Sequence, residues 1–139
     1  MTIKSFSGTY RFLSNFWICP VMYDAVIYRS SEHAFVAAKT LDLGERKLVF
    51  NTQTPGQVKR LGRQLSLRPD WNDIRTRIMY TIVNDKFHRT PELAELLLST
   101  SNHALIEGNT WNDQFWGQCN GKGANWLGRI LMDIRSKLS

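Results

Sequence analysis

The chain has 139 residues, of which 18 are Lys or Arg and 12 are Asp or Glu, so its formal net charge is +6. This length predicts a single domain over residues 1–139 with a core of its own. Two widely separated cysteines exclude a disulfide framework, and no apolar run approaches the about 20 residues of a membrane span. No long apolar segment opens the chain, so we expect a cytoplasmic protein, and its positive charge favours an anionic ligand.

The N-terminal part is rich in aromatic and β-branched residues, which favour strands. Residues 21–23 and 26–28 flank Asp24-Ala25 and predict a small β-hairpin. The serines at 30–31 are candidate N-caps of a helix that we expect to reach about Leu41.

Thr54 followed by Pro55 predicts the start of a second helix, because proline is favoured in the first helical turn. Its expected apolar stripe and its basic face are Val58, Leu61 and Leu65, and Lys59, Arg60 and Arg63.

The remaining chain is predicted to be mainly helical. Pro69-Asp70 opens the longest helix, to about Phe87, and Thr90-Pro91 opens the next. A short strand is expected at 104–106, and a last helix begins near Asn125. The pattern predicts an α+β, predominantly helical fold with a small N-terminal β-hairpin packed on several helices. The expected buried positions of these helices are Trp71, Ile74, Ile78, Met79, Ile82 and Val83, then Leu93, Leu96 and Leu97, then Leu127, Ile130, Leu131, Ile134 and Leu138.

Residues 111–128 contain three tryptophans, one acid and four glycines. Tryptophan offers a rigid face on which a flat ring can stack, and glycine lets the backbone approach a ligand closely. The segment therefore suggests the wall of a pocket for a planar, phosphorylated molecule. The alternative is a tight turn whose tryptophans fill the core.

Glu32 is the first candidate for chemistry. It lies in the first turn of a predicted helix, where the dipole keeps a carboxylate ionised, and it shares a stripe with Lys39. The alternative is that Glu32 only complements the helix terminus. The histidines are not paired at i, i+4, so we expect no metal.

Two further candidates are aromatic and acidic. Trp71 opens the longest helix, a place where a tryptophan usually anchors the core. Asp113 precedes Trp116 by three residues, so a base could stack while its sugar lies near a carboxylate. N-glycoside cleavage needs such an arrangement, because its transition state resembles an oxocarbenium ion.

Ordered blocks of the sequence resemble the NADAR family, also called YbiA-like. They run from Phe12 to Arg135, nearly the whole chain. One turn departs from the family pattern, because it reads Asp24-Ala25 where Asp-Gly is expected. The blocks include Phe12-Leu13-Ser14-Asn15-Phe16, Ser31-Glu32-His33-Ala34-Phe35 with Lys39, Asp70-Trp71, Lys86-Phe87, Leu105-Ile106-Glu107, Asn112-Asp113-Gln114-Phe115-Trp116-Gly117 and Gly121-Lys122-Gly123.

The resemblance implies an N-glycosidase without metal or organic cofactor. Its implied substrates are riboflavin-synthesis intermediates that carry a ribosyl phosphate, or ADP-ribosylated guanine in a nucleotide or nucleic acid. The family's functional positions match Glu32 and Asp113 as catalytic acids and Trp71 and Trp116 as base-binding residues. The further substrate-binding candidates are Asn15, Lys39, Lys86, Gly117 and Asn125.

Two other functions stay open at this point. One is a non-catalytic module that binds ADP-ribose or nucleic acid through the same aromatic and basic residues. The other is a helix-turn-helix over 57–87, in which only scattered arginines would face DNA.

Overall fold

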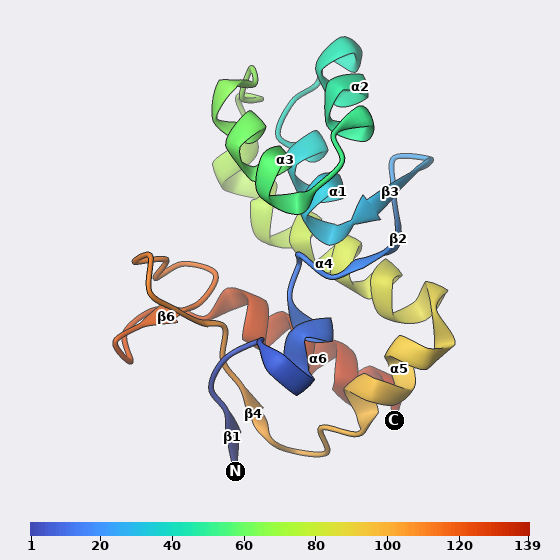
Figure 1. Cartoon of the computed structure of the whole chain (residues 1–139). Coiled ribbons are helices and arrows are strands. Elements are labelled where there is room, and N and C mark those ends of the chain that lie inside the picture. The colour runs from blue at the N-terminus through green and yellow to red at the C-terminus, as the bar shows by residue number, and fades with distance from the viewer. The chain divides into compact units, whose positions relative to one another are not determined.

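The computed structural model describes every residue, Met1 to Ser139, and the chain forms two compact units (Figure 1). The central unit is Asn15–Arg89, and the terminal unit joins Met1–Ser14 to Thr90–Ser139. No helix combines the length and the apolar character that crossing a membrane requires. The predicted single domain over 1–139 stays a prediction.

The central unit packs one hairpin on helices, as predicted. Both hairpin strands contact α1, and β2 also contacts α4. Helix α1 packs in addition against α2 and α3 (Figure 1). The elements are β2 (Ile18–Tyr23), β3 (Val26–Ser30), α1 (Ser31–Ala38), α2 (Leu43–Asn51), α3 (Pro55–Leu61), the 3-10 helix η2 (Gly62–Gln64) and α4 (Trp71–Arg89).

The hairpin turn contains Asp24-Ala25, the residue pair that departs from the Asp-Gly of the family pattern. Tyr23 pairs with Val26, so Asp24 and Ala25 are the two turn residues, and their φ angles are 50° and 65°. Two consecutive positive φ angles define a type I′ turn, whose second residue is usually glycine. Ala25 therefore holds a left-handed backbone against the steric preference of its Cβ.

We expect Ala25→Gly to stabilise the protein by about 0.5 to 1 kcal/mol, because relief of the left-handed strain exceeds the backbone entropy of glycine. Urea unfolding measures the change. The matched control is Ala94→Gly within α5 (Pro91–Leu98), which should cost about 1 kcal/mol. Equal destabilisation by both variants would contradict this account of the turn.

Helix α1 is the centre of its unit. The Ser30 hydroxyl accepts a hydrogen bond from the His33 backbone N–H, which confirms the predicted N-cap. His33 is buried, and its ring nitrogens lie 2.7 Å from the Ser30 hydroxyl and 2.9 Å from the Thr52 carbonyl. Burial lowers the pKa of His33, so a neutral core histidine is favoured.

Two boundaries in this unit differ from the prediction. Helix α1 ends at Ala38 rather than near Leu41, because the chain turns so that Asp42 can cap α2. The whole of α2 was missed, since among its residues only Arg46 and Val49 are buried and no apolar stripe marks it. Leu65 lies beyond α3 and is half-buried, although the Thr54 capping box confirms the predicted start of α3.

The terminal unit is built around α6 (Trp126–Leu138), which packs on β4 (Ala104–Leu105) and α5. Strand β4 pairs in parallel with β1 (Thr2–Ile3), and β5 (Gly108–Asn109) pairs in parallel with β6 (Gln118–Cys119). A 3-10 helix η1 (Gly8–Leu13) contacts α5.

The predicted cores of the later helices are largely confirmed. The buried residues include Leu127, Ile130, Leu131 and Ile134 of α6. Three positions were wrong: Leu96 is 43% exposed, and Ile74 and Leu138 are only half-buried. Ile74 lies in the first turn of α4 and Leu138 is the last residue of α6, so both are at helix ends.

Candidate active site

Glu32 is the second residue of α1, in the central unit. Its backbone N–H donates to the Asn15 carbonyl at 3.0 Å, so the loop before β2 fixes the start of the helix. Its half-buried side chain acts electrostatically on Lys39, as their common stripe predicts. Burial is the main cause that lowers the pKa of Lys39, Glu32 opposes it, and Lys59 and Arg63 reinforce it.

Asn15 and Ser31 leave buried polar atoms without a partner. The Asn15 Oδ1 and the Ser31 Oγ accept or donate no hydrogen bond, and the Asn15 Nδ2 donates only to the Met79 sulfur at 3.5 Å. Buried polar groups normally find partners, and thioether sulfur is a weak acceptor. Both residues adjoin Glu32, Ser31 in sequence and Asn15 through its carbonyl. These atoms are suited to a bound molecule or water.

Trp71 is 6% exposed and begins α4. Its ring lies 5.0 Å from that of Phe35 at an interplanar angle of 55°. Phe35 also lies below the Lys39 ammonium, with Nζ 5.6 Å from its ring centroid. Trp71 thus contributes to the core of the central unit, and only a small edge is open to a ligand.

Lys86 has no exposed surface and lies in the last turns of α4. Burial lowers its pKa to about 8, although the nearby Cys19 thiol opposes this effect. The sequence names Lys86 only as a substrate-binding candidate and does not reveal that the hairpin strand β2 packs against α4.

The buried Lys86 should make stability rise with pH. Between pH 8 and the ordinary value of 10.5, the unfolded chain holds a proton that the folded chain has lost, so the unfolding free energy rises by about 3 kcal/mol. Urea unfolding of Lys86→Met should lack this rise. The control Lys47→Met, at an exposed position of α2, should keep it, and equal slopes for all three proteins would contradict the assignment.

In the terminal unit, Asp113 organises the loop before β6. Its Oδ1 accepts hydrogen bonds from the backbone N–H groups of Phe115 and Trp116, at 3.1 and 2.9 Å. The Asn109 side chain holds the backbone of Asp113, because its amide donates to the Asp113 carbonyl at 2.9 Å and accepts from the Asp113 N–H at 3.0 Å. The carboxylate is therefore fixed by main-chain contacts on a short turn.

Trp116 is half-buried, next to the loop that Asp113 caps. Its ring meets Phe115 edge to face, with centroids 4.8 Å apart and an angle of 89°. Phe115 in turn lies 6.4 Å from Trp126 at the start of α6. Phe115, which lies between Trp116 and Trp126, supports a Trp116 ring that keeps some exposure, and the predicted base-stacking role of Trp116 stays a prediction.

Asn125 and Gly117 are structural in this unit. The Asn125 amide donates to the Leu105 carbonyl and accepts from the Glu107 N–H, both at 2.9 Å, and the residue is 6% exposed. Its φ of 55° also starts α6 from a left-handed residue. A methyl group at Gly117 would overlap the carboxylate and carbonyl of Glu107. The predicted substrate contacts of both residues stay predictions.

Glu107 is a residue that the sequence prediction missed. Its Oε2 accepts from the Asn109 amide at 3.1 Å, so one side chain links the Glu107 carboxylate to the Asp113 loop. The sequence showed Glu107 only as one acid in a family block. Its place depends on contacts with Asn109 and Gly117, which no local pattern reveals.

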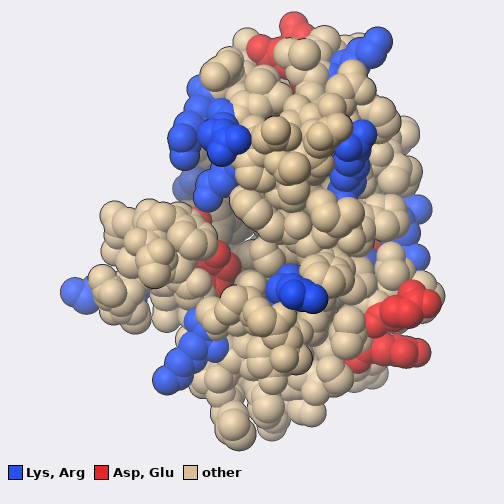
Figure 2. Space-filling view, viewed as in Figure 1, with Lys and Arg blue, Asp and Glu red and all other residues tan.

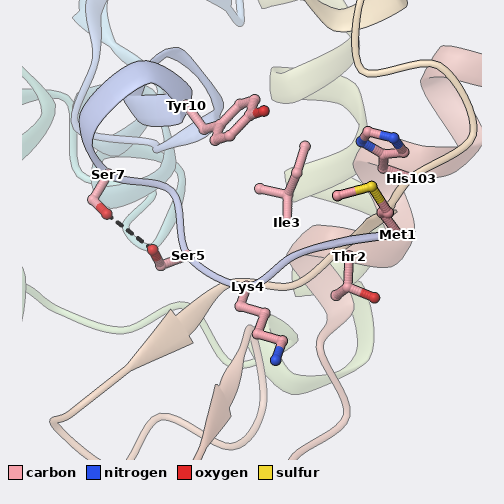
Figure 3. Close-up of a pocket in the computed structure, with 8 residues that line it drawn as sticks. All are labelled: Met1, Thr2, Ile3, Lys4, Ser5, Ser7, Tyr10 and His103. Atoms are coloured by element: carbon pink, nitrogen blue, oxygen red, sulfur yellow. Dashed lines mark hydrogen bonds between the residues drawn. The ribbon is translucent and has the colours of Figure 1, made fainter.

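One surface hollow of the terminal unit is lined by none of these residues. It has a volume of about 400 Å³ and is lined by residues 1–5, Ser7, Tyr10 and His103. Figure 3 shows Ile3 pointing toward the rings of Tyr10 and His103, with Lys4 pointing away. No Asp or Glu lines the hollow, so it lacks the carboxylate that N-glycoside hydrolysis requires.

Metal-ligating side chains do not gather in this protein. No group of three or more His, Cys, Asp or Glu residues could hold a metal ion. Cys19 and Cys119 are both buried free thiols.

Comparison with known proteins identifies the family. A model of the NADAR domain matches residues 4–139. The N-glycosidase YbiA of Shigella boydii serotype 4 (strain Sb227) is 38% identical over 138 residues, 97% of this chain and 86% of that protein. A riboflavin biosynthesis protein of Vibrio vulnificus (strain YJ016) is 38% identical over 130 residues, 91% of this chain and 35% of that protein.

A solved structure agrees with the sequence matches. The NMR structure of E. coli YbiA superposes with a TM-score of 0.87 at 35% identity, over 99% of this chain and 83% of that chain. The predicted α+β, mainly helical fold is thereby confirmed. From its ordered motifs, its fold and these matches, the chain belongs to the NADAR domain family.

Proposed function

We propose that this chain is an N-glycosidase that hydrolyses the bond between a ribose anomeric carbon and a guanine-like base. The observation that carries the proposal is the match over 97% of the chain to a protein named N-glycosidase YbiA. The two acids support it, because each is held by main-chain contacts: Glu32 on α1 and Asp113 on its turn.

The reaction needs a carboxylate to stabilise a sugar cation and an acid–base group to move protons. As the C–N bond breaks, the bonding electron pair leaves with the base nitrogen, and water adds its oxygen to the anomeric carbon. One proton of that water passes to a carboxylate, and the departing nitrogen gains a proton. We assign these two roles to Glu32 and Asp113, without an order between them.

The proposed substrates carry a phosphorylated ribose. They are an intermediate of riboflavin synthesis with a ribosyl phosphate, or ADP-ribosylated guanine. The first class is supported by the riboflavin biosynthesis protein that is 38% identical to this chain. A cytoplasmic location belongs to the same proposal, since buried free thiols suit a reducing compartment.

The test is to incubate the purified chain with each substrate class and to measure released base and sugar phosphate by chromatography and mass spectrometry. We expect one class to be hydrolysed, with base and sugar phosphate released in equal amounts, both with and without EDTA. Binding of ADP-ribose or guanine nucleotide without release of base would support the non-catalytic module instead. If EDTA abolished the activity and one divalent ion restored it, the metal-free mechanism would be wrong.

A further inference from the structure

One side chain of the terminal unit, Asn109, touches both Glu107 and Asp113. Its amide nitrogen donates to the Glu107 Oε2 at 3.1 Å and to the Asp113 carbonyl at 2.9 Å, and its Oδ1 accepts from the Asp113 N–H at 3.0 Å. An amide nitrogen carries two hydrogens, and here each of them has an acceptor. Three contacts thus fix the Asn109 amide, and that amide holds the main chain of Asp113 on two sides.

Glu107 itself is held from three directions. Its N–H donates to the Asn125 Oδ1 and its carbonyl accepts from the Gln118 N–H, both at 2.9 Å. Its carboxylate lies against Gly117, where a methyl group would overlap the Oε2. The glycine therefore leaves the space that the half-buried carboxylate occupies. Figure 2 shows acidic side chains beside the loop that Figure 1 labels β6, although the net charge of the chain is +6.

A carboxylate is a stronger partner for Asn109 than the fold alone requires. Partial burial of a charge costs solvation energy, and a neutral acceptor could hold an amide at a lower cost. Hydrogen bonds to an ionised acceptor are about twice as strong as those between neutral groups. An ionised carboxylate also only accepts, so it requires the nitrogen side of the Asn109 amide and excludes the flipped orientation. The charge of Glu107 therefore restricts Asn109 more tightly than a neutral side chain would.

The direction of the Asp113 carboxylate depends on this restraint. Its Oδ1 accepts from the N–H groups of Phe115 and Trp116, so the carboxylate is tied to the main chain of its own turn. Its direction therefore follows from the place of the Asp113 main chain, which Asn109 holds. An error of about 1 Å in the place of a reacting group can lower a rate about a hundredfold.

We propose that Glu107 is a positioning residue of the proposed reaction and acts on Asp113 through Asn109. This inference rests on the proposed N-glycosidase function, and it adds to the site two residues that are not among the candidates from the sequence. The order of contacts is that of other acid–base sites, in which one polar group orients the next and the last one reacts.

The kinetic test compares Glu107→Gln, Asn109→Ala and the double variant. The glutamine keeps the size of the side chain and one acceptor oxygen but removes the charge. We expect kcat on the best substrate to fall about tenfold in each single variant, with KM within about threefold of the wild type. The double variant should lose no more than Asn109→Ala alone, because Glu107 acts through Asn109. Losses that multiply would show that Glu107 acts without Asn109, and the proposal would be wrong.

Gln114→Ala is the matched control. Gln114 lies in the same turn and is exposed, and its amide donates to the Asn112 side chain at 3.0 Å rather than to Glu107 or Asp113. Its kcat should stay within about twofold of the wild type, and urea unfolding checks that every variant is folded. A tenfold loss of kcat in this control would overturn the proposal.

Amide hydrogen exchange measured by NMR tests the positioning without any substrate. Asn109 binds the Asp113 N–H, and the Asp113 Oδ1 binds the N–H groups of Phe115 and Trp116. We expect these three groups to exchange at least about fivefold faster in Glu107→Gln than in the control variant. If no substrate is hydrolysed but faster exchange is seen, the N-glycosidase proposal fails and the positioning contact stands. If hydrolysis occurs, unchanged exchange or a wild-type kcat in Glu107→Gln would show that the inference is wrong.

Discussion

Glu32→Gln is expected to lower kcat at least about a hundredfold while the protein stays folded, the effect usual for a positioned acid or base. The amide keeps the size of the side chain and removes its charge. Steady-state turnover of the best substrate measures the loss, and circular dichroism with urea unfolding checks the fold.

Glu92→Gln is the matched control, because Glu92 is the second residue of α5, as Glu32 is of α1. If Glu32 only complements a helix terminus, both variants should lose a few tenths of a kcal/mol of stability and keep full turnover. Wild-type turnover by Glu32→Gln would therefore remove Glu32 from the mechanism.

The same kind of substitution tests Asp113, because an asparagine there removes the charge and can keep the hydrogen bonds of the loop. Asp113→Asn keeps an Oδ1 that can accept from the Phe115 and Trp116 N–H groups, so its loop should persist. We expect an about hundredfold loss of kcat from the missing charge alone. Asp42→Asn is the control, since Asp42, the N-cap of α2, also accepts a hydrogen bond from a backbone N–H, that of Glu45.

Local signals in the sequence predicted most of the fold. Ser30 caps α1, and Thr54 caps α3 with a capping box, because N-cap chemistry depends on three or four consecutive residues. The hairpin pairing was also predicted. Helix α2 was not predicted, since Leu43 and Leu48 are exposed and leave it without an apolar stripe, although Asp42 caps its start and the helix packs on α1.

The candidate site was harder to predict, because long-range contacts decide what each side chain can do. The amide of Asn125, a predicted substrate-binding residue, is hydrogen-bonded to the Leu105 carbonyl and the Glu107 N–H, contacts that no local pattern predicts. Lys86 is a substrate-binding candidate by resemblance, but it is fully buried on α4, on which β2 packs. Asp113 could be proposed from the sequence because it precedes Trp116 by three residues and matches a functional position of the family, and its catalytic role stays a prediction.

The two tryptophans of the predicted stacking pair should respond differently to truncation. Trp71→Ala removes a ring that is 6% exposed and packed on Phe35, so we expect a cavity and a loss of about 3 to 5 kcal/mol of stability. Trp116→Ala removes a half-buried ring, so we expect ligand binding to weaken by about 1 to 3 kcal/mol with a smaller stability loss.

Urea unfolding and calorimetric titration with ADP-ribose or guanine nucleotide separate these effects, and Trp111→Ala is the control. Trp111 lies in the same loop as Trp116 and is 59% exposed, so its truncation should change stability little. A Trp116→Ala variant that is strongly destabilised yet binds normally when folded would show that Trp116 is a core plug. The base would then have to stack elsewhere, and the exposed Phe16 ring beneath Lys59 would be the next residue to test.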